Sequence, residues 1–549
     1  MLAFVPRPGG RCLIQDLTDD GDAAGEQREV RVDELTSTEA QRWLWATTAG
    51  DYPALLAAGL RVPRCHDIAA VERILLGRAG VFGDPATPAA VVARALGRPV
   101  PYTSVSVDDA PSLFDLTGAD DDGVDALDVL RQAYRDQRRR AGGDGALTLL
   151  LAAENASALA AAEMGAVGLP WQRAVHLAVL DEMLGTRPVL GGRPPRLVEL
   201  AGEIDAAFGF PVSADSAVDL RAAFGRVGFD VESTRSWVIK GIDHPAVGPV
   251  LAYKELARLH SANGWAWLDQ WVRDDRFRAE YLSGAVVSGR WATRGGGALQ
   301  IPRLLRQAVV ADDGYRLIVA DAAQLEPRVL AAISADVALQ AVSASNESGG
   351  DLYAGLAADG FGGNRASAKV AMLGAMYGAT TGESGRLVGT LRMRYPAAMG
   401  FVDAAARAGE GGEVVHSVLG RACPPPGPSW EAVRIGRQQD ATTAERKRAD
   451  RLAGDRGRFT RNFVVQASAA DWAAVWLAGL RTSLADVDGA ELVFFQHDEL
   501  IVHAPAAVAD RVATLIEDAA DAARRLVFPG SAVLTPVRPV IVGRYADAK

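Results

Sequence analysis

Residues 491–505 read ELVFFQHDELIVHAP, and this stretch decides which fold the chain can adopt. Two apolar runs flank the polar tetrapeptide QHDE, a pattern that predicts a β-hairpin. Most hairpin turns use Asn-Gly or Asp-Gly for their backbone conformation. This turn instead sets Asp498 and Glu499 beside His497, and neighbouring carboxylates repel each other unless a cation is present. A solvated acidic turn is the alternative, but the flanking strands are more apolar than an ordinary surface ribbon.

Another carboxylate ends a second predicted strand. Residues 316–334 read RLIVADAAQLEPRVLAAIS, in which an apolar strand ends at Asp321 and a helical stretch follows. A carboxylate at the end of a buried strand can present a metal ligand to a cleft. Taken alone, Asp321 fits equally well as the cap of the following helix.

A third stretch, NRASAKVAMLGAMYG at 364–378, predicts a helix capped by Asn364. Arg365 and Lys369 are spaced i, i+4 and so share one face, where two like charges destabilise an isolated helix. Cations near a helix N-terminus also oppose its dipole. These two costs favour a bound polyanion such as a triphosphate; an ordinary solvated basic face is the alternative.

Taken together, the three stretches indicate phosphoryl or nucleotidyl transfer. Two carboxylates from separate strands can hold a pair of Mg²⁺ ions about 3.5–4 Å apart, as in-line displacement requires. The two helix cations would then stabilise charge on the outer phosphates.

The chain resembles the family A DNA polymerases, the bacterial DNA polymerase I class. The resemblance spans residues 146–545 and is carried by DAAQLEPRVL, RASAKVAMLGAMYG, GRFTRNFVVQASAADWA and FFQHDELIVHAP. It is strongest to the short actinobacterial 3′–5′ exonuclease/polymerase type. It implies an α/β multidomain fold, in which a degenerate RNase H-like exonuclease domain precedes a right-hand polymerase domain. The implied limits are 1–145 for the exonuclease-like domain, 146–285 for the thumb, and 286–549 for palm and fingers, with the fingers at about 340–455.

The resemblance also assigns roles. It implies two Mg²⁺ ions, replaceable by Mn²⁺, bound by Asp321 and Asp498 with Glu499 beside them, and Lys369 as the proton donor to pyrophosphate. Glu326 would exclude a 2′-hydroxyl, and Tyr377 would lie near the templating base. The implied nucleotide contacts are Arg365, Lys369, Leu373, Tyr377, Gln324, Glu326 and Tyr353, and the implied DNA contacts are Arg290, Arg458, Asn462, Gln466 and His497. The implied partners are primer–template DNA and deoxynucleoside triphosphates.

Some motif positions depart from the family pattern. Ala322, Ala323 and Pro327 replace a Tyr, a Ser and a Leu, Leu373 replaces a ring-bearing residue, and Tyr353 replaces a His. We therefore expect a working polymerase with altered nucleotide handling.

The N-terminal region lacks the expected exonuclease carboxylates. No DxE follows the opening strands, where Asp16, Asp19 and Asp20 are out of pattern, and Asp51 alone fits a later acidic position. YRDQRRR does not supply Tyr-x3-Asp. We expect a structural remnant without proofreading activity.

Composition first argues against a nucleic-acid partner, because 58 Lys and Arg face 68 Asp and Glu, a net charge of −10. The distribution reverses this. Residues 281–311 contain no acidic residue, and 434–461 contain nine basic and four acidic residues. These stretches predict a basic groove on an acidic body.

The remaining composition points to a cytoplasmic protein without a membrane partner. The resemblance to family A polymerases adds the expectation of a monomer associated with the nucleoid. The three cysteines are far apart in sequence, and no signal peptide or uncharged apolar run of about 18 residues stands out.

Three alternatives stay open. A single-subunit RNA polymerase would share the three-motif logic but should have a small residue at Glu326. A catalytically impaired DNA-binding protein of the same fold would not need Asp321, Asp498, Arg365 and Lys369. A nuclease acting only through the N-terminal region is disfavoured by the missing DxE.

Overall fold

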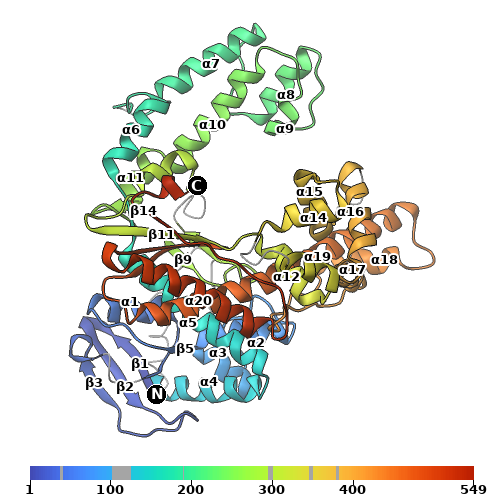
Figure 1. The fold of residues 1–549 in the computed structure, drawn as a ribbon. Coiled ribbons are helices and arrows are strands. Elements are labelled where there is room, and N and C mark those ends of the chain that lie inside the picture. The colour runs from blue at the N-terminus through green and yellow to red at the C-terminus, as the bar shows by residue number, and fades with distance from the viewer. Residues whose placement is uncertain are drawn as a thin grey trace. The chain divides into compact units, whose positions relative to one another are not determined.

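The chain is described from a computed structural model, drawn in Figure 1. The structure describes residues 1–36, 41–101, 125–189, 191–294, 301–344, 350–378 and 382–548. Contacts divide the chain into two compact units, each built from separate stretches. Unit one comprises Met1–Ala166, Tyr281–Ala292 and Ile318–Ile541, and unit two comprises Val167–Glu280, Thr293–Leu317 and Val542–Lys549. The domain limits near 145 and 285 stay a prediction.

Unit one begins with a five-stranded sheet in the order β3-β2-β1-β4-β5. β1 pairs antiparallel with β2 and parallel with β4, and β4 pairs parallel with β5. Fully buried Trp43 packs against Phe4, with 5.8 Å between ring centroids. The elements are β1 (Leu2–Arg7), β2 (Arg11–Asp16), β3 (Arg28–Arg31), β4 (Trp43–Trp45), β5 (Cys65–Asp67), α1 (Thr48–Ala57), α2 (Ile68–Arg78), α3 (Pro88–Ala95) and α4 (Ala126–Ala141).

In this region the sequence predicts strands at RCLIQDL and RWLWATTAG and a helix at DIAAVERILLG. The first strand and the helix are confirmed as β2 and α2. The second strand, β4, is shorter than predicted, because helix α1 already begins at Thr48.

A second sheet of unit one has the order β12-β13-β11-β14. β12 and β13 form the predicted hairpin, in which Gln496 pairs with Glu499 and leaves His497 and Asp498 as the turn. The core residues of β11 and β13 are fully buried, as their continuous apolar runs predict. The strands are β11 (Tyr315–Asp321), β12 (Glu491–Gln496), β13 (Glu499–Pro505) and β14 (Val540–Val542).

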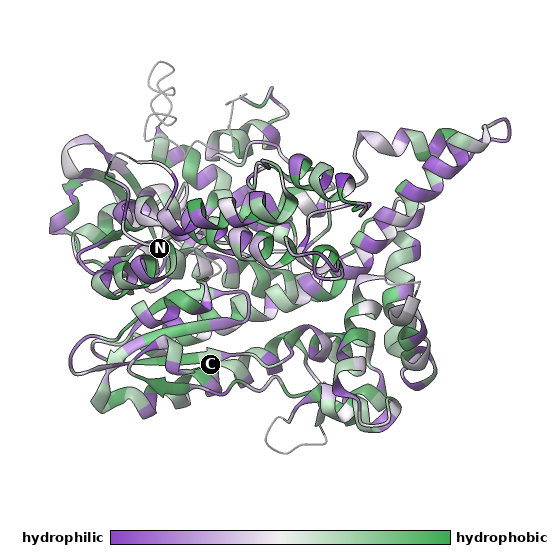
Figure 2. Cartoon of the chain, turned by 90° about the horizontal axis from the view of Figure 1, so that it is seen from above, coloured by the Kyte–Doolittle hydropathy of each residue, from purple (hydrophilic) through white to green (hydrophobic). Residues whose placement is uncertain are grey.

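Helices complete unit one. α5 and α19 share one hydrophobic core that also includes residues of β11, β13 and α20. The helices are α5 (Gly145–Val167), α12 (Leu325–Ser334), α13 (Val337–Ala344), α14 (Leu352–Gly360), α15 (Arg365–Tyr377), α16 (Gly382–Arg394), α17 (Pro396–Gly411), α18 (Glu431–Gly436), α19 (Thr443–Leu484) and α20 (Ala509–Val527). The helices in Figure 2 mix hydrophobic and hydrophilic residues along their length, as elements with one buried face do.

Within the described part of the chain, α5 and α19 are long and apolar enough, by length and composition, to cross a membrane. Their most apolar windows are 56% and 78% buried inside the protein. Core packing therefore accounts for their apolar character.

Unit two is mainly helical, and the sequence from 147 to about 275 shows the apolar periodicity typical of helices. Trp171, Trp267 and Phe277 form an aromatic cluster, with 5.4 Å between the two indole centroids. Trp267, one of three tryptophans that cluster at 265–271 in the sequence, therefore serves packing. The elements of this part of the chain are β6 (Leu169–Pro170), α6 (Arg173–Leu184), α7 (Pro195–Phe208), α8 (Ala217–Arg226), α9 (Ser236–Ile239), α10 (Val247–Asn263), α11 (Trp265–Trp271), β7 (Val272–Arg273), β8 (Arg276–Phe277), β9 (Glu280–Leu282) and β10 (Ala292–Arg294).

Candidate active site

Two carboxylate-bearing segments meet at the end of the second sheet of unit one. β11 ends at Asp321, and the β12–β13 turn carries Asp498. The backbone N–H of Ala322 donates a hydrogen bond of 2.8 Å to the carbonyl oxygen of Asp498. The end of β11 and the β12–β13 turn, whose aspartates are 177 residues apart in sequence, therefore lie side by side.

The electrostatics of this junction penalise two negative charges. Burial, and after it the nearby charge of Asp321, raise the pKa of Asp498 to about 6. Glu499, also buried, adds a smaller repulsion. A divalent cation bound here would neutralise the repulsion between the carboxylates of Asp321, Asp498 and Glu499.

The donor set suits Mg²⁺ or Mn²⁺. Among the described residues no three His, Cys, Asp or Glu side chains come together to form an all-protein cage. Mg²⁺ commonly takes only one or two carboxylates and completes its octahedron with water and substrate phosphates. Asp321 and Asp498 offer such an incomplete set of hard oxygen ligands.

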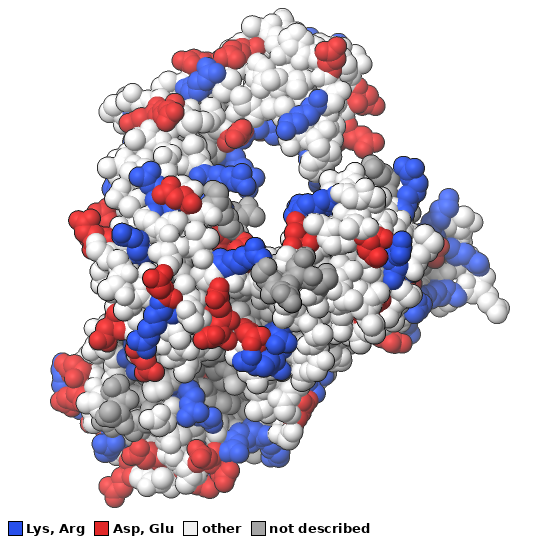
Figure 3. Space-filling view, viewed as in Figure 1, with Lys and Arg blue, Asp and Glu red and all other residues white. Residues whose placement is uncertain are grey.

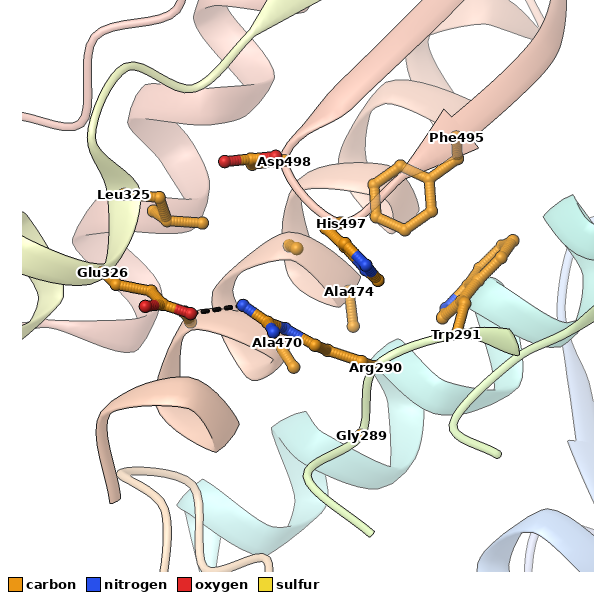
Figure 4. A pocket seen from close by; sticks show the side chains of 12 residues that line it. Gly289, Arg290, Trp291, Leu325, Glu326, Ala470, Ala474, Phe495, His497 and Asp498 are labelled. Atoms are coloured by element: carbon orange, nitrogen blue, oxygen red, sulfur yellow. Dashed lines mark hydrogen bonds and ion pairs between the residues drawn. The ribbon is translucent and has the colours of Figure 1, made fainter. Parts of the chain in front are cut away.

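A pocket opens beside the two carboxylates. In Figure 4, Arg290 and Glu326 point toward each other from opposite walls, and their side chains form an ion pair. Asp498 and His497 project into the same pocket from the hairpin turn. The lining residues are Gly289, Arg290, Trp291, Leu325, Glu326, Ala469, Ala470, Ala473, Ala474, Phe495, His497 and Asp498.

One predicted DNA contact has a buried polar atom for which the described residues supply no hydrogen-bond partner. This atom is Nδ1 of His497. His497 also adopts a positive φ of 57°, which is uncommon for a residue other than glycine. Unpaired buried polar atoms and strained backbone often occur together at functional sites, where a ligand supplies the missing partner.

Helix α15 forms as predicted, with Asn364 accepting a 3.0 Å hydrogen bond from the N–H of Ser367. Arg365 and Lys369 are both exposed on this helix. Arg365 is paired with Asp351, which raises the pKa of the guanidinium, and it lies 5.6 Å from the ring centre of Tyr353.

The C-terminal end of α15 reaches Glu326. Tyr377 is 48% exposed, and burial together with the Glu326 charge raises the pKa of its hydroxyl. Burial and the same carboxylate raise the pKa of Tyr353 to about 12. Leu373 is partly buried and packs against the core. Glu326 thus lies near both tyrosines that were predicted to contact the nucleotide.

Other predicted contacts are placed differently. Gln324 does not line the pocket; its amide donates to Asp351 at 2.9 Å and accepts from the N–H of Leu352 at 2.8 Å. Arg458 is exposed and paired with Asp455, and Gln466 is partly buried on α19. The nucleotide contact of Gln324 and the DNA contacts of Arg458 and Gln466 stay predictions.

The count of basic residues in 434–461 overstates the surface charge. Arg461 is buried and paired with Asp403 at 2.5 Å, so it stabilises the packing of α19 on α17. Figure 3 nevertheless shows Lys and Arg side chains gathered around the region labelled α18 in Figure 1. Whether this surface forms the predicted groove stays a prediction.

Asp351 is a site residue that the sequence motifs did not reveal. It accepts hydrogen bonds from Gln324 and from the N–H groups that begin α14, and it pairs with Arg365. Its one sequence signal is its place before the helix DLYAGLA, which is typical of an N-cap. Its contact with Arg365 depends on tertiary packing.

Comparisons with known proteins match the part of the chain that contains the candidate active site. A family model described as DNA polymerase family A matches residues 227–530. Thermostable DNA polymerase I of Thermus filiformis is 26% identical over 372 residues, 60% of this chain and 42% of that protein. DNA polymerase I of Deinococcus radiodurans is 27% identical over 309 residues, 52% of this chain and 30% of that protein. The chain thus spans less than half the length of these relatives.

A solved structure shares the fold along the whole chain. The POL domain of Pol1 from M. smegmatis, in complex with DNA primer-template and dNTP, aligns with a TM-score of 0.71 at 16% identity. The alignment covers 100% of this chain and 95% of that one. The fold is therefore that of a family A polymerase domain.

Proposed function

Because this chain belongs to DNA polymerase family A, we propose that it adds deoxynucleotides to a primer 3′-hydroxyl under the direction of a template. The observation that carries the proposal is the convergence of Asp321 and Asp498 beside the pocket lined by Arg290, Glu326 and His497. Primer–template DNA and deoxynucleoside triphosphates are the proposed partners, and the M. smegmatis domain was solved with both.

Asp321 and Asp498 would hold Mg²⁺, with Mn²⁺ as a substitute and Glu499 as a supporting charge. When bound, a pair of such ions lowers the pKa of the attacking hydroxyl and neutralises charge on the leaving pyrophosphate. The raised pKa of Asp498 supports this assignment, because a site that repels a second negative charge gains most from a cation.

Arg365 and Lys369, the two cations of α15, bind the triphosphate. Arg365 exchanges its contact with Asp351 for phosphate oxygens, which match the guanidinium geometry. Lys369, one turn further along the exposed face, donates a proton to the pyrophosphate as it leaves. Tyr377 lies at the far end of the same helix, beside the templating base.

Glu326 selects the sugar. Its carboxylate lies in the pocket, paired with Arg290, and occupies space that a 2′-hydroxyl would need. Tyr353 and Leu373 alter the nucleotide pocket relative to the family pattern. An enzyme of the RNA polymerase type would lack this carboxylate, so a strong preference for deoxynucleotides separates the two proposals.

The N-terminal sheet is proposed as an RNase H-like remnant in residues 1–145 that does not proofread. Its order, β3-β2-β1-β4-β5 with three antiparallel strands followed by two parallel ones, supports that fold. β1 carries no carboxylate, and acidic residues after β2 are paired with α4, Asp22 with Arg135 and Asp20 with Arg138. Paired carboxylates are poor candidates for metal ligands.

Primer extension tests both proposals on one gel. With Mg²⁺ or Mn²⁺ and all four deoxynucleotides, wild type should extend a labelled primer, and Asp321→Asn should not. Without nucleotides the primer should keep its length in both proteins. Absence of product in the wild type would contradict polymerase function. Primer shortening that survives Asp321→Asn would contradict the loss of proofreading.

A further inference from the structure

One buried cation of unit one is used by none of the roles above. Arg421 lies in a tight turn, where the N–H of Ser417 donates a 2.9 Å hydrogen bond to the carbonyl of Arg421. Its guanidinium pairs with Glu154 of α5 and with Asp471 of α19, the latter at 3.2 Å. The three side chains are 9%, 7% and 0% exposed.

Stability alone is a weak reason for such a cluster. Buried ion pairs lose hydration, and apolar side chains of similar size often replace them without loss of stability. The cluster also holds one cation between two carboxylates, and burial raises the pKa of Asp471 even though Arg421 lowers it. A specific geometric role is the better explanation.

The ion cluster of Arg421, Glu154 and Asp471 lies directly against the main chain of residues 284–290. Gly289 has a φ of +84°, and a Cβ built there would lie 2.6 Å from Cζ of Arg421. Gly284 has a φ of +60°, and its Cβ would lie 2.7 Å from Oε2 of Glu154. The main chain therefore lies directly against the buried ions at both glycines, and no side chain separates them.

The same segment ends at Arg290 in the pocket. Two hydrogen bonds close it into a turn, from the N–H of Gly289 to the Val286 carbonyl at 2.7 Å and from the N–H of Val286 to the Arg290 carbonyl at 3.0 Å. Asp471 belongs to α19, whose neighbouring residues Ala470 and Ala473 line the pocket. The ion cluster thus joins the Arg290 segment to the helix that forms the pocket floor.

We propose that Arg421 is a positioning residue for the primer terminus. It holds Arg290 at a fixed place in the pocket through Gly289, while Glu154 and Asp471 hold Arg421. The family resemblance implies that Arg290 contacts the minor groove of the primer–template, where duplex shape is sensed with little sequence information. A shift of its backbone therefore weakens the discrimination between paired and mispaired primer ends. This proposal rests on the proposed polymerase function.

The test compares Arg421→Lys with Arg481→Lys. Lysine keeps the charge but cannot span two carboxylates as a guanidinium does. Arg481 of α19 is a matched control, because its side chain is only 12% exposed, pairs with Glu163 at 2.6 Å and otherwise bonds the carbonyls of Val62 and Pro63. Both variants should lower the melting temperature. Arg421→Lys alone should lower the ratio of matched to mismatched extension, by about ten- to a hundredfold.

A double variant separates positioning from general destabilisation. If Arg421 acts through Arg290, then Arg421→Lys should add little to the loss seen in Arg290→Ala. Losses that multiply, or an equal change of the ratio in Arg481→Lys, would overturn the proposal. Gly289→Ala, which pushes the segment away from an intact ion cluster, should lower the ratio as well and serves if Arg421→Lys fails to fold.

Hydrogen exchange gives a readout that does not require activity. The amides of Val286 and Gly289 should exchange faster in Arg421→Lys than in wild type and in Arg481→Lys. Unchanged exchange would overturn the positioning role. If exchange is faster in Arg421→Lys but the wild-type protein extends no primer, the positioning role stands and the polymerase function is contradicted instead.

Discussion

The two sheets of unit one place acidic residues near strand ends in opposite environments. After β2 in the N-terminal sheet, Asp20 and Asp22 are paired with Arg138 and Arg135 of α4. In the other sheet, Asp321 and Asp498 lie side by side and repel each other. An acidic residue at a strand end is therefore informative only when a second carboxylate converges on it. The N-terminal region is therefore a natural control for substitutions at the Asp321–Asp498 junction.

The largest expected effect is the loss of extension in Asp321→Asn. Removing a metal ligand removes several kcal/mol of transition-state stabilisation, or a loss on the order of 10³-fold in kcat. Asp51→Asn changes a buried carboxylate of α1, in the same N-terminal region as the first sheet, and should leave kcat within about twofold of wild type. Steady-state primer extension measures both. Equal losses in the two variants would remove the distinction between the sheets.

Glu326→Ala should admit ribonucleotides. The preference for deoxynucleotides should fall by on the order of 10²-fold, because the carboxylate that excludes the 2′-hydroxyl is gone. Single-nucleotide insertion with matched deoxy- and ribonucleotides gives the ratio. An unchanged ratio would assign sugar selection to another residue, with Tyr353 the first to test.

Arg365→Ala should weaken nucleotide binding. A charge-assisted hydrogen bond contributes about 1.5–3 kcal/mol, so the KM for deoxynucleotides should rise by roughly ten- to a hundredfold. Arg434→Ala, an exposed arginine paired with Glu431, is the control and should leave KM unchanged. A lower kcat at constant KM would show that Arg365 acts on the chemical step instead.

The smallest effect concerns stability in the first sheet. Burial raises the pKa of Asp51 to about 7 from an ordinary value near 3.8. The folded state thus binds a proton that the unfolded state releases, so this stabilisation is complete below pH 4 and is lost as the pH rises through 7. Asp51→Asn should therefore match wild type near pH 4 and melt a few degrees higher above pH 7. Calorimetry at several pH values measures the difference, which should grow with pH.

Local patterns account for what the sequence predicted well. The β12–β13 hairpin, the strand ending at Asp321 and the Asn364 cap each depend on neighbours within a few residues. Contacts between distant segments were missed. Asp351 with Arg365 is visible only after packing, and Arg461 was counted as surface charge although it is buried. Sequence periodicity shows which residues turn inward but not which partner they meet.

Helix α19 connects two distant parts of unit one. Its 42 residues span about 63 Å at 1.5 Å per residue, and they carry Arg458, Asn462, Asp471 and Arg481 on one continuous rod. Arg481 donates hydrogen bonds to carbonyls of the N-terminal sheet region. Asp471 pairs with Arg421, which lies against the segment that ends at Arg290. One helix therefore connects the N-terminal sheet region to the ion cluster that contacts the Arg290 segment, so a change at one end can be transmitted to the other.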